Sequence, residues 1–350
     1  MCYYNTLSIS AIFIPVSHRK RKINRIGPGP PKCKAYRVGA SDLSYQITIA
    51  RPVETSGIGL HTAVRSKLRL LPAPADTGIV FRRVDLDDFE IEARAENVAR
   101  VSYATSLMKK GVLLSTTEHL LAALYSCGVD NVYVEIDALE LPILDGSALP
   151  FIKMLERAGI RHLRRRRRFL QVVKPLELED GDPRKPGLVR RIGIYPSEEF
   201  RVRCSIDYPH PAIGREEIEV SVNRETFSRD LAPARTFGFL SEEAQMRAIG
   251  LIRGVSYENA IVLNPERVVN GQLRFADEFV RHKALDLIGD LALFGLPLKA
   301  LVVANKAGHA LHTQLVARLL ADRSLWVETS AESSSSATPV ELRHAVPASD

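Results

Sequence analysis

Apolar residues occupy most positions between Asp277 and Phe294, and this nearly continuous pattern predicts a buried helix. Asp277 is suited to the N-cap position, where its side chain can accept a hydrogen bond from the first helical turn. His282, Asp286 and Asp290 interrupt the apolar pattern at intervals of four residues, which places them on one face of the helix. A buried carboxylate requires a compensating partner, and either a lysine or a metal ion would serve.

Elsewhere, short stretches of alternating apolar and polar residues predict strands, and these fall into two groups on either side of an arginine run at 164–168. Each group ends in the same order of elements. The predicted helix, strand and helix lie at 115–128, 131–137 and 151–159 in the first half, and at 277–294, 299–304 and 308–320 in the second. We therefore predict an α+β fold of two similar domains, residues 42–163 and 169–328, with the arginine run as a solvated linker.

Local signals refine this outline. Ser115 and Glu118 have the spacing of a capping box, in which Glu118 would be the third residue of the helix. Residues 177–190 are charged and contain Gly and Pro, which predicts a loop. Residues 329–350 are rich in Ser, Ala and Pro, and we expect them to be disordered.

The composition is that of a globular protein with room for a sizeable core. The chain has 350 residues, of which 45% are hydrophobic, and this length suits two domains. No run approaches the roughly 20 apolar residues that a membrane-spanning helix needs. The four cysteines are scattered and form no CxxC pair: Cys2, Cys33, Cys127 and Cys204. This pattern argues against a disulfide framework and a cysteine zinc site, and it fits a reducing compartment.

Positive charge is concentrated at the start of the chain. The formal net charge is +7, and residues 1–41 contain eight Lys or Arg and no acid, so the remainder carries −1 (7 minus 8). This basic leader contains Ser, Pro, Gly and a short apolar patch, which is typical of an organelle transit peptide. A disordered tail or a mispredicted gene start would give the same composition. Because the rest of the chain is nearly neutral, its charge does not indicate a nucleic-acid partner.

Histidines and carboxylates in the predicted helices form a candidate metal site. His119, His282 and Asp286 give a set of two histidines and one carboxylate. Three protein ligands leave zinc one open position for water, which is the arrangement of catalytic sites. The same ligand types also suit iron. Asp290 would not bind the ion itself but would support the residues that do.

Four further side chains could complete a hydrolytic site. Glu118 lies beside His119 and could take a proton from water, and His309 could give one to a leaving group. Thr236 and Lys283 could stabilise a developing oxyanion. Each has an ordinary structural role as well: helix cap, neighbour of a cap, turn residue and surface charge.

Seven motifs occur along the chain in this order: Gly57–Thr62, Pro72–Thr77, Thr117–Leu120, Asp145–Phe151, Ala234–Phe239, Phe279–Asp290 and Ala307–Leu311. Together they resemble the UDP-3-O-acyl-N-acetylglucosamine deacetylase family, from about Tyr45 to about Leu320. The resemblance implies two α+β domains, each a sheet packed on two helices, with the helix layers sandwiched between the sheets. It places the active site at the domain junction.

The implied reaction is zinc-dependent hydrolysis of the N-acetyl group of UDP-3-O-acyl-N-acetylglucosamine, which gives the free amine and acetate in lipid A biosynthesis. The implied partner is thus a UDP-sugar lipid, and we expect a monomer without a nucleic-acid partner. The family also occurs in plants as a mitochondrial form. Together with the leader this favours the mitochondrion, and the cytoplasm of a Gram-negative bacterium is the alternative.

The resemblance also implies a role for each candidate residue. Zinc ligands are His119, His282 and Asp286; Glu118 is the general base and His309 the general acid, oriented by Asp290. Thr236 binds the oxyanion, Lys283 contacts substrate and stabilises charge, and Phe237 contacts the sugar nucleotide. Ile249, Leu251 and Gly254 belong to an insert around the acyl chain.

Two other hypotheses remain open at this stage. An inactive homologue would keep the fold and act as a binding protein. An RNA-binding protein would use the basic leader and the arginine run, and its binding would depend steeply on salt.

Overall fold

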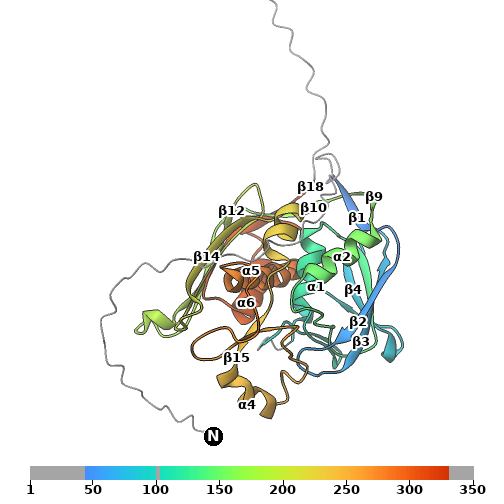
Figure 1. Cartoon of the computed structure of the whole chain (residues 1–350). Helices are drawn as coiled ribbons and strands as arrows, with labels where there is room; N and C mark the ends of the chain where they lie inside the picture. The colour runs from blue at the N-terminus through green and yellow to red at the C-terminus, as the bar shows by residue number, and fades with distance from the viewer. Residues whose placement is uncertain (1–43, 100–102, 331–350) are drawn as a thin grey trace, which may run out of the picture.

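The computed structural model describes residues 44–99 and 103–330 (Figure 1). The basic leader at 1–41 and residues 331–350 of the expected disordered tail lie outside the described residues. Within the described ranges, no helix is both long enough and apolar enough to cross a membrane.

The N-terminal half forms a five-stranded sheet with the strand order β2-β3-β8-β4-β5. Its strands are β2 (Val53–Ile58), β3 (Arg65–Pro72), β4 (Ile79–Arg83), β5 (Phe89–Glu92) and β8 (Val132–Ile136). Alternate residues of β3 and β8 are buried, so one face of the sheet is apolar. Helices α1 (Glu118–Ser126) and α2 (Leu149–Ala158) cover that face (Figure 1).

The C-terminal half forms a seven-stranded sheet in which the central strand is β17 (Leu298–Asn305). The other strands are β10 (Arg168–Val172), β11 (Leu176–Asp180), β12 (Arg190–Pro196), β13 (Arg201–Tyr208), β14 (Gly214–Ser221) and β18 (Trp326–Ser330). Helices α5 (Glu278–Leu291) and α6 (His309–Ala321) pack on it. The predicted buried helix is therefore confirmed, and a 3-10 turn, Ala292–Phe294, ends it.

Smaller elements surround the two sheets. They are a ribbon of β1 (Tyr45–Ile49) and β9 (Ile160–Arg166), a hairpin of β6 (Leu107–Lys109) and β7 (Val112–Leu114), and a parallel pair of β15 (Phe237–Phe239) and β16 (Ile261–Leu263). Helix α4 (Leu240–Ala248) follows β15 and lies at one end of the molecule, while a short turn of helix, α3 (Arg224–Thr226), follows β14.

The layers confirm the fold that the sequence predicted. In Figure 1 the sheet containing β12 and β14 lies on one side, the helices lie in the middle, and the sheet containing β2, β3 and β4 lies on the other side. Helices α1 and α5 meet across the junction of the two halves. Gly289 makes their close approach possible, because a Cβ atom there would lie 2.1 Å from the carbonyl oxygen of Glu118.

We expect the replacement of Gly289 by alanine to destabilise the protein by about 1–3 kcal/mol, the usual cost of overpacking a core. The added methyl group meets backbone rather than a flexible side chain, so the two helices must separate. Urea unfolding would measure the change. Gly187 is the control, since a Cβ there meets nothing within 4 Å; equal stability of the two variants would contradict the close contact.

Three local predictions were wrong. Helix α1 begins at Glu118 without a side-chain cap, because Thr116 adopts a positive φ of 60° and the Ser115 hydroxyl bonds Ser106 instead. The expected loop at 177–190 contains most of β11, whose charged residues are tolerated at a sheet edge. Asp277 is the N-cap by position, but its carboxylate binds the Arg281 guanidinium rather than the helix backbone.

The arginine run is also not a solvated linker. Arg164 to Arg166 belong to β9, and β10 begins at Arg168. Between these strands the Arg167 side chain is only 6% exposed, and its Nε donates a 2.9 Å hydrogen bond to Asp130. Backbone pairing and this buried ion pair hold the segment in place.

Candidate metal centre

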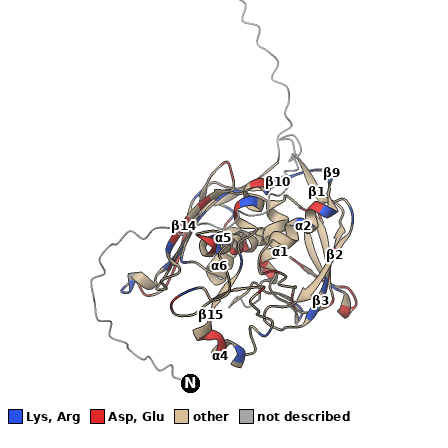
Figure 2. Cartoon of the chain, viewed as in Figure 1, with Lys and Arg blue, Asp and Glu red and all other residues tan. Residues whose placement is uncertain are grey.

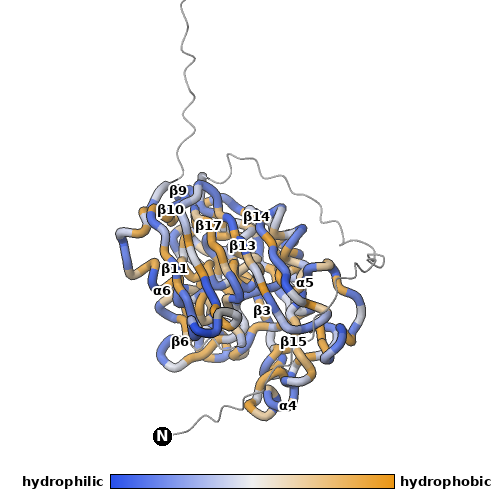
Figure 3. Tube along the Cα trace, turned by 90° about the vertical axis from the view of Figure 1, so that its left-hand side faces the viewer, coloured by the Kyte–Doolittle hydropathy of each residue, from blue (hydrophilic) through white to orange (hydrophobic). Residues whose placement is uncertain are grey.

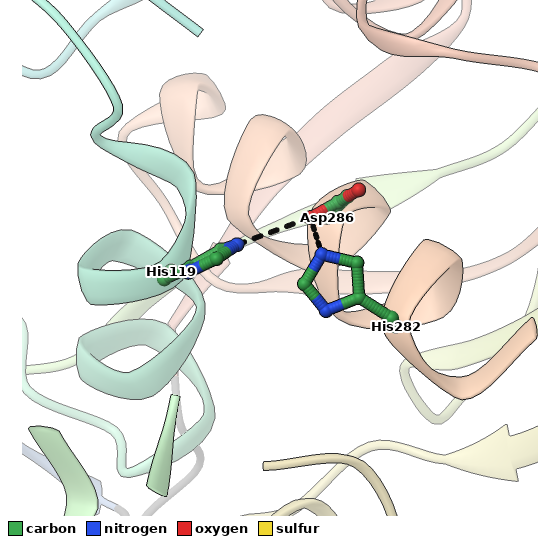
Figure 4. Close-up of side chains that lie close together, drawn as sticks. All are labelled: His119, His282 and Asp286. Carbon is green, nitrogen blue, oxygen red and sulfur yellow. Dashed lines mark ion pairs between the residues drawn. The ribbon is translucent and has the colours of Figure 1, made fainter. Parts of the chain in front are cut away.

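Helices α1 and α5 bring three predicted metal ligands together. His119 comes from α1, and His282 and Asp286 come from successive turns of α5 (Figure 4). The Nε2 atoms of His119 and His282 lie 3.6 Å and 3.4 Å from Oδ1 of Asp286. All three side chains are buried, and the two imidazole rings are nearly perpendicular with centroids 5.0 Å apart.

The spacing of these donor atoms fits a metal ion. Zinc ligands at roughly 2.0–2.1 Å in tetrahedral geometry lie about 3.3–3.4 Å apart. The observed separations of 3.4 and 3.6 Å are close to that value and longer than a hydrogen bond. Two imidazole nitrogens and a carboxylate oxygen are also donors that zinc prefers. The residues present therefore fit the ion.

Neighbouring groups prepare the ligands for coordination. Nδ1 of His282 donates a 3.1 Å hydrogen bond to the Ala234 carbonyl, which leaves the lone pair on Nε2. Burial lowers the pKa of His282 to about 3, so its imidazole is neutral. Burial alone would raise the pKa of Asp286, but the charged Lys283 ammonium beside it helps to outweigh burial and to hold that pKa well below its usual value. Lys283 donates to Oδ2 of Asp286 at 2.9 Å.

Glu118 is the first residue of α1 and directly precedes the predicted ligand His119. Its side chain is only 4% exposed, and its Oε2 accepts a 3.0 Å hydrogen bond from the backbone N–H of Thr105. Burial raises the pKa of this carboxyl group, which makes the carboxylate a stronger base. The residue is thus held in place, and within the described part of the chain its carboxylate forms no salt bridge.

Asp290 is the centre of a second polar cluster, one turn of α5 beyond Asp286. Its Oδ2 accepts hydrogen bonds from Nδ1 of His309 at 2.7 Å and from Nδ1 of His312 at 2.8 Å, while Oδ1 accepts one from the Thr105 hydroxyl. The carboxylate is fully buried, so these three donors supply the compensation that it needs.

His309 connects the two clusters. Its Nδ1 faces Asp290, and its Nε2 lies 4.0 Å from Oδ2 of the predicted ligand Asp286. Burial alone would lower the pKa of His309, but Asp290 outweighs burial and raises it to about 9. At neutral pH this imidazole therefore carries a proton that it can donate beside the metal centre.

Thr236 lies in the segment that carries the Ala234 carbonyl, two residues further along the chain. Its backbone N–H donates to Gly146 at 2.8 Å and its carbonyl accepts from Ile261 at 2.7 Å, which anchors it between a turn and β16. Phe237 follows, and its ring centroid lies 6.5 Å from that of His282. Both side chains are half-buried, and the Phe237 ring borders the predicted ligand His282.

The predicted acyl-chain residues directly follow α4, in a segment that reaches the N-terminal half. Ile249 is 59% exposed, Leu251 is half-buried and Gly254 is buried. The N–H of Gly254 donates to the Leu60 carbonyl at 3.0 Å, and a Cβ at this position would lie 2.1 Å from the Gly59 carbonyl oxygen. Gly254 thus fixes this segment against the N-terminal half, a role that the sequence did not indicate.

Sequence reasoning missed two members of the site. His312 follows His309 by three residues on α6, and helical spacing could have placed both on one face. Thr105 lies outside any predicted element and gave no signal. It nevertheless donates to Glu118 through its N–H and to Asp290 through its hydroxyl, so it joins the two clusters.

Comparisons with known proteins agree with this geometry. A family model described as UDP-3-O-acyl N-acetylglycosamine deacetylase matches residues 46–321. A curated UDP-3-O-acyl-N-acetylglucosamine deacetylase of Solibacter usitatus is 54% identical over 285 residues, which cover 81% of this chain and 94% of the relative. Another of that name from Geotalea uraniireducens is 44% identical over 286 residues, covering 81% and 91%. The chain also matches a third, from Syntrophotalea carbinolica, at 43% identity.

Proposed function

The chain belongs to the UDP-3-O-acyl-N-acetylglucosamine deacetylase family and is a hydrolase of lipid A biosynthesis, and we propose that it works with zinc held by His119, His282 and Asp286. The reaction removes the N-acetyl group of UDP-3-O-acyl-N-acetylglucosamine. The observation that carries the zinc proposal is the convergence of two Nε2 atoms on one carboxylate oxygen, at 3.4 and 3.6 Å.

Different side chains of the protein are assigned to the separate proton transfers of the reaction. When bound, the metal ion lowers the pKa of a coordinated water and polarises the acetyl carbonyl. We assign Glu118 as the general base, because its buried carboxylate has a raised pKa and accepts a single hydrogen bond, from Thr105. It takes the proton of the attacking water, which forms the new bond to the carbonyl carbon.

The leaving amine requires a proton when the C–N bond breaks. We assign this proton to His309, whose raised pKa keeps it protonated at neutral pH. Asp290 holds the imidazole by Nδ1, so Nε2 is the atom that donates. Thr236 is our candidate donor to the oxyanion, since only its backbone N–H and carbonyl are hydrogen-bonded among the described residues and its hydroxyl is left over.

The substrate is proposed to extend from the metal centre in two directions. Phe237 offers an aromatic face to the sugar nucleotide, and Lys283 offers a cation 5.7 Å from that ring. Ile249 and Leu251, with the segment fixed by Gly254, are proposed to receive the acyl chain. Exposed apolar side chains such as Ile249 are suited to a lipid tail.

Acetate release from UDP-3-O-acyl-N-acetylglucosamine by the full chain tests the proposal. We expect release that a chelator abolishes and that added zinc restores. The side chains of His119, His282 and Asp286 alone do not lower the pKa of a water molecule, so they cannot activate it without the ion. Ferrous ion, supplied without oxygen, is the comparison that separates zinc from iron. No release from a folded, zinc-loaded protein would contradict the proposed function.

We propose the cytoplasm of a Gram-negative bacterium as the compartment, rather than the mitochondrion. The support is the bacterial origin of relatives at 43–54% identity. A fusion of residues 1–41 to a reporter is therefore expected to stay outside isolated mitochondria. Import with cleavage of the leader would overturn this proposal in favour of a transit peptide.

A further inference from the structure

The arginine run leaves a feature that catalysis does not use. Residues 160–168 contain six arginines and no acid: Arg161, Arg164, Arg165, Arg166, Arg167 and Arg168. Among the described residues, strand β9 pairs only with β1. Every residue of β9 except Ile160 and Leu163 is exposed.

Some of these charges are already compensated. Arg165 pairs with Asp76 at 2.9 Å, Arg168 pairs with Glu328 at 3.1 Å, and the guanidinium of Arg166 lies 4.6 Å from the centre of the Tyr45 ring. Arg161 and Arg164 have no ion pair or hydrogen bond from their side chains within the described residues. The guanidinium charges of Arg161 and Arg164 are therefore expected to attract anions.

Further exposed arginines lie beside β1, and one of them is at the end of α2 next to the exposed acid Glu156. Arg157 lies in the last turn of α2, and its carbonyl accepts a 2.8 Å hydrogen bond from Nε of Arg51, which follows β1. Both side chains are exposed, and Arg161 pairs with Thr48 of β1 nearby. Figure 2 shows the basic residues of β9 and of the end of α2. We call Arg51, Arg157, Arg161 and Arg164 the basic ribbon.

We propose that the basic ribbon docks the enzyme on the surface of an anionic phospholipid bilayer. Charge complementarity favours such a surface, because each basic side chain near it adds to the attraction. The choice of lipid rests on the proposed function, whose substrate carries an acyl chain. Helix α4 lies at the end of the molecule opposite β9 in both views (Figures 1 and 3), so docking leaves that end open.

Two other readings of the ribbon fit less well. Single-stranded RNA binds basic grooves through aromatic side chains on which its bases stack. Strands β1 and β9 contain one Phe, Tyr or Trp, which is Tyr45, and its ring already contacts the Arg166 guanidinium. Charged residues on an edge strand also prevent pairing with other chains. Acidic residues would prevent such pairing equally well, so this role does not explain why every charge on the strand is positive.

Flotation of the full chain with vesicles tests the proposal. Vesicles of phosphatidylcholine alone are compared with vesicles that also contain phosphatidylglycerol, at low and high salt. We expect binding only to the anionic vesicles, and weaker binding at high salt. The double variant R161Q/R164Q is expected to bind about 30-fold more weakly, since each basic side chain contributes roughly a five-fold preference. R161K/R164K keeps the charge and is expected to bind like the parent.

The matched control is R65Q/R215Q, which removes two exposed arginines from β3 and β14 and changes the net charge equally. An equal loss in both glutamine variants would overturn the proposal, as would equal binding to phosphatidylcholine alone. Loss of binding to a single-stranded RNA oligonucleotide, with vesicle binding retained, would assign the ribbon to RNA instead. Thermal unfolding verifies that each variant is folded. The assay contains no substrate, so an absence of deacetylation does not affect its outcome.

Discussion

The H282A variant is expected to lose its metal ion and to lower kcat/KM for acetate release by about 1,000-fold or more. A bound ion contributes several kcal/mol to the transition state, and each 1.36 kcal/mol is a factor of ten. His282 is 1% exposed and supplies one of three donors, so alanine leaves a two-donor site that cannot hold zinc tightly. Metal analysis of the purified protein, together with turnover, measures both effects.

H210A is the control for this experiment. Like His282, His210 forms a hydrogen bond to a backbone carbonyl, with Nε2 2.7 Å from the Asn264 oxygen. It is partly buried and belongs to neither polar cluster. We expect it to keep one metal ion per chain. If H282A retained the ion with parental affinity, the proposed donor set would be wrong.

The E118Q variant is expected to keep the metal ion and to turn over about 100- to 10,000-fold more slowly, the usual contribution of a general base. Glutamine has the same shape, and its amide oxygen can still accept the hydrogen bond from Thr105. The change therefore removes the base and leaves the structure in place. A rate equal to that of the parent would favour the inactive-homologue hypothesis or a different base.

The pH dependence gives E118Q a second readout. Burial raises the pKa of Glu118, and only the ionised carboxylate can accept a proton. In the parent, kcat/KM should therefore fall as the pH drops below that raised pKa. The variant has no such group, so the acidic limb of its profile should be flat where Glu118 titrates. An unchanged acidic limb would assign that ionisation to another residue.

Periodicity was a sound guide where burial on one face decided the structure. The helix at 278–291 and the four-residue spacing of His282, Asp286 and Asp290 followed from the sequence alone. The position of the partner helix α1 did not follow from the sequence. His119 faces α5 because Gly289 lets the Glu118 backbone approach closely, and no local sequence pattern predicts that contact. The resemblance to a family supplied that link.

Charged segments misled the sequence reading for a related reason. Strand β11 has its leucines half-buried between acids, and β9 is almost wholly exposed, so neither shows a clear apolar face. Both lie at edges, where backbone pairing with one neighbour decides the structure. Thr105 went unnoticed because its contacts, through both its backbone N–H and its hydroxyl, are with residues distant in the sequence.

The proposed metal ligands are divided between α1 and α5, so the order in which the chain is synthesised affects when the site is complete. A ribosome completes α1 long before it reaches α5, and N-terminal domains generally fold first. During that interval the growing chain presents His119 and Glu118 without His282 or Asp286. An unfinished enzyme would therefore hold the proposed base and one proposed ligand without the other two ligands, and we expect hydrolysis only after the second half has docked on the first.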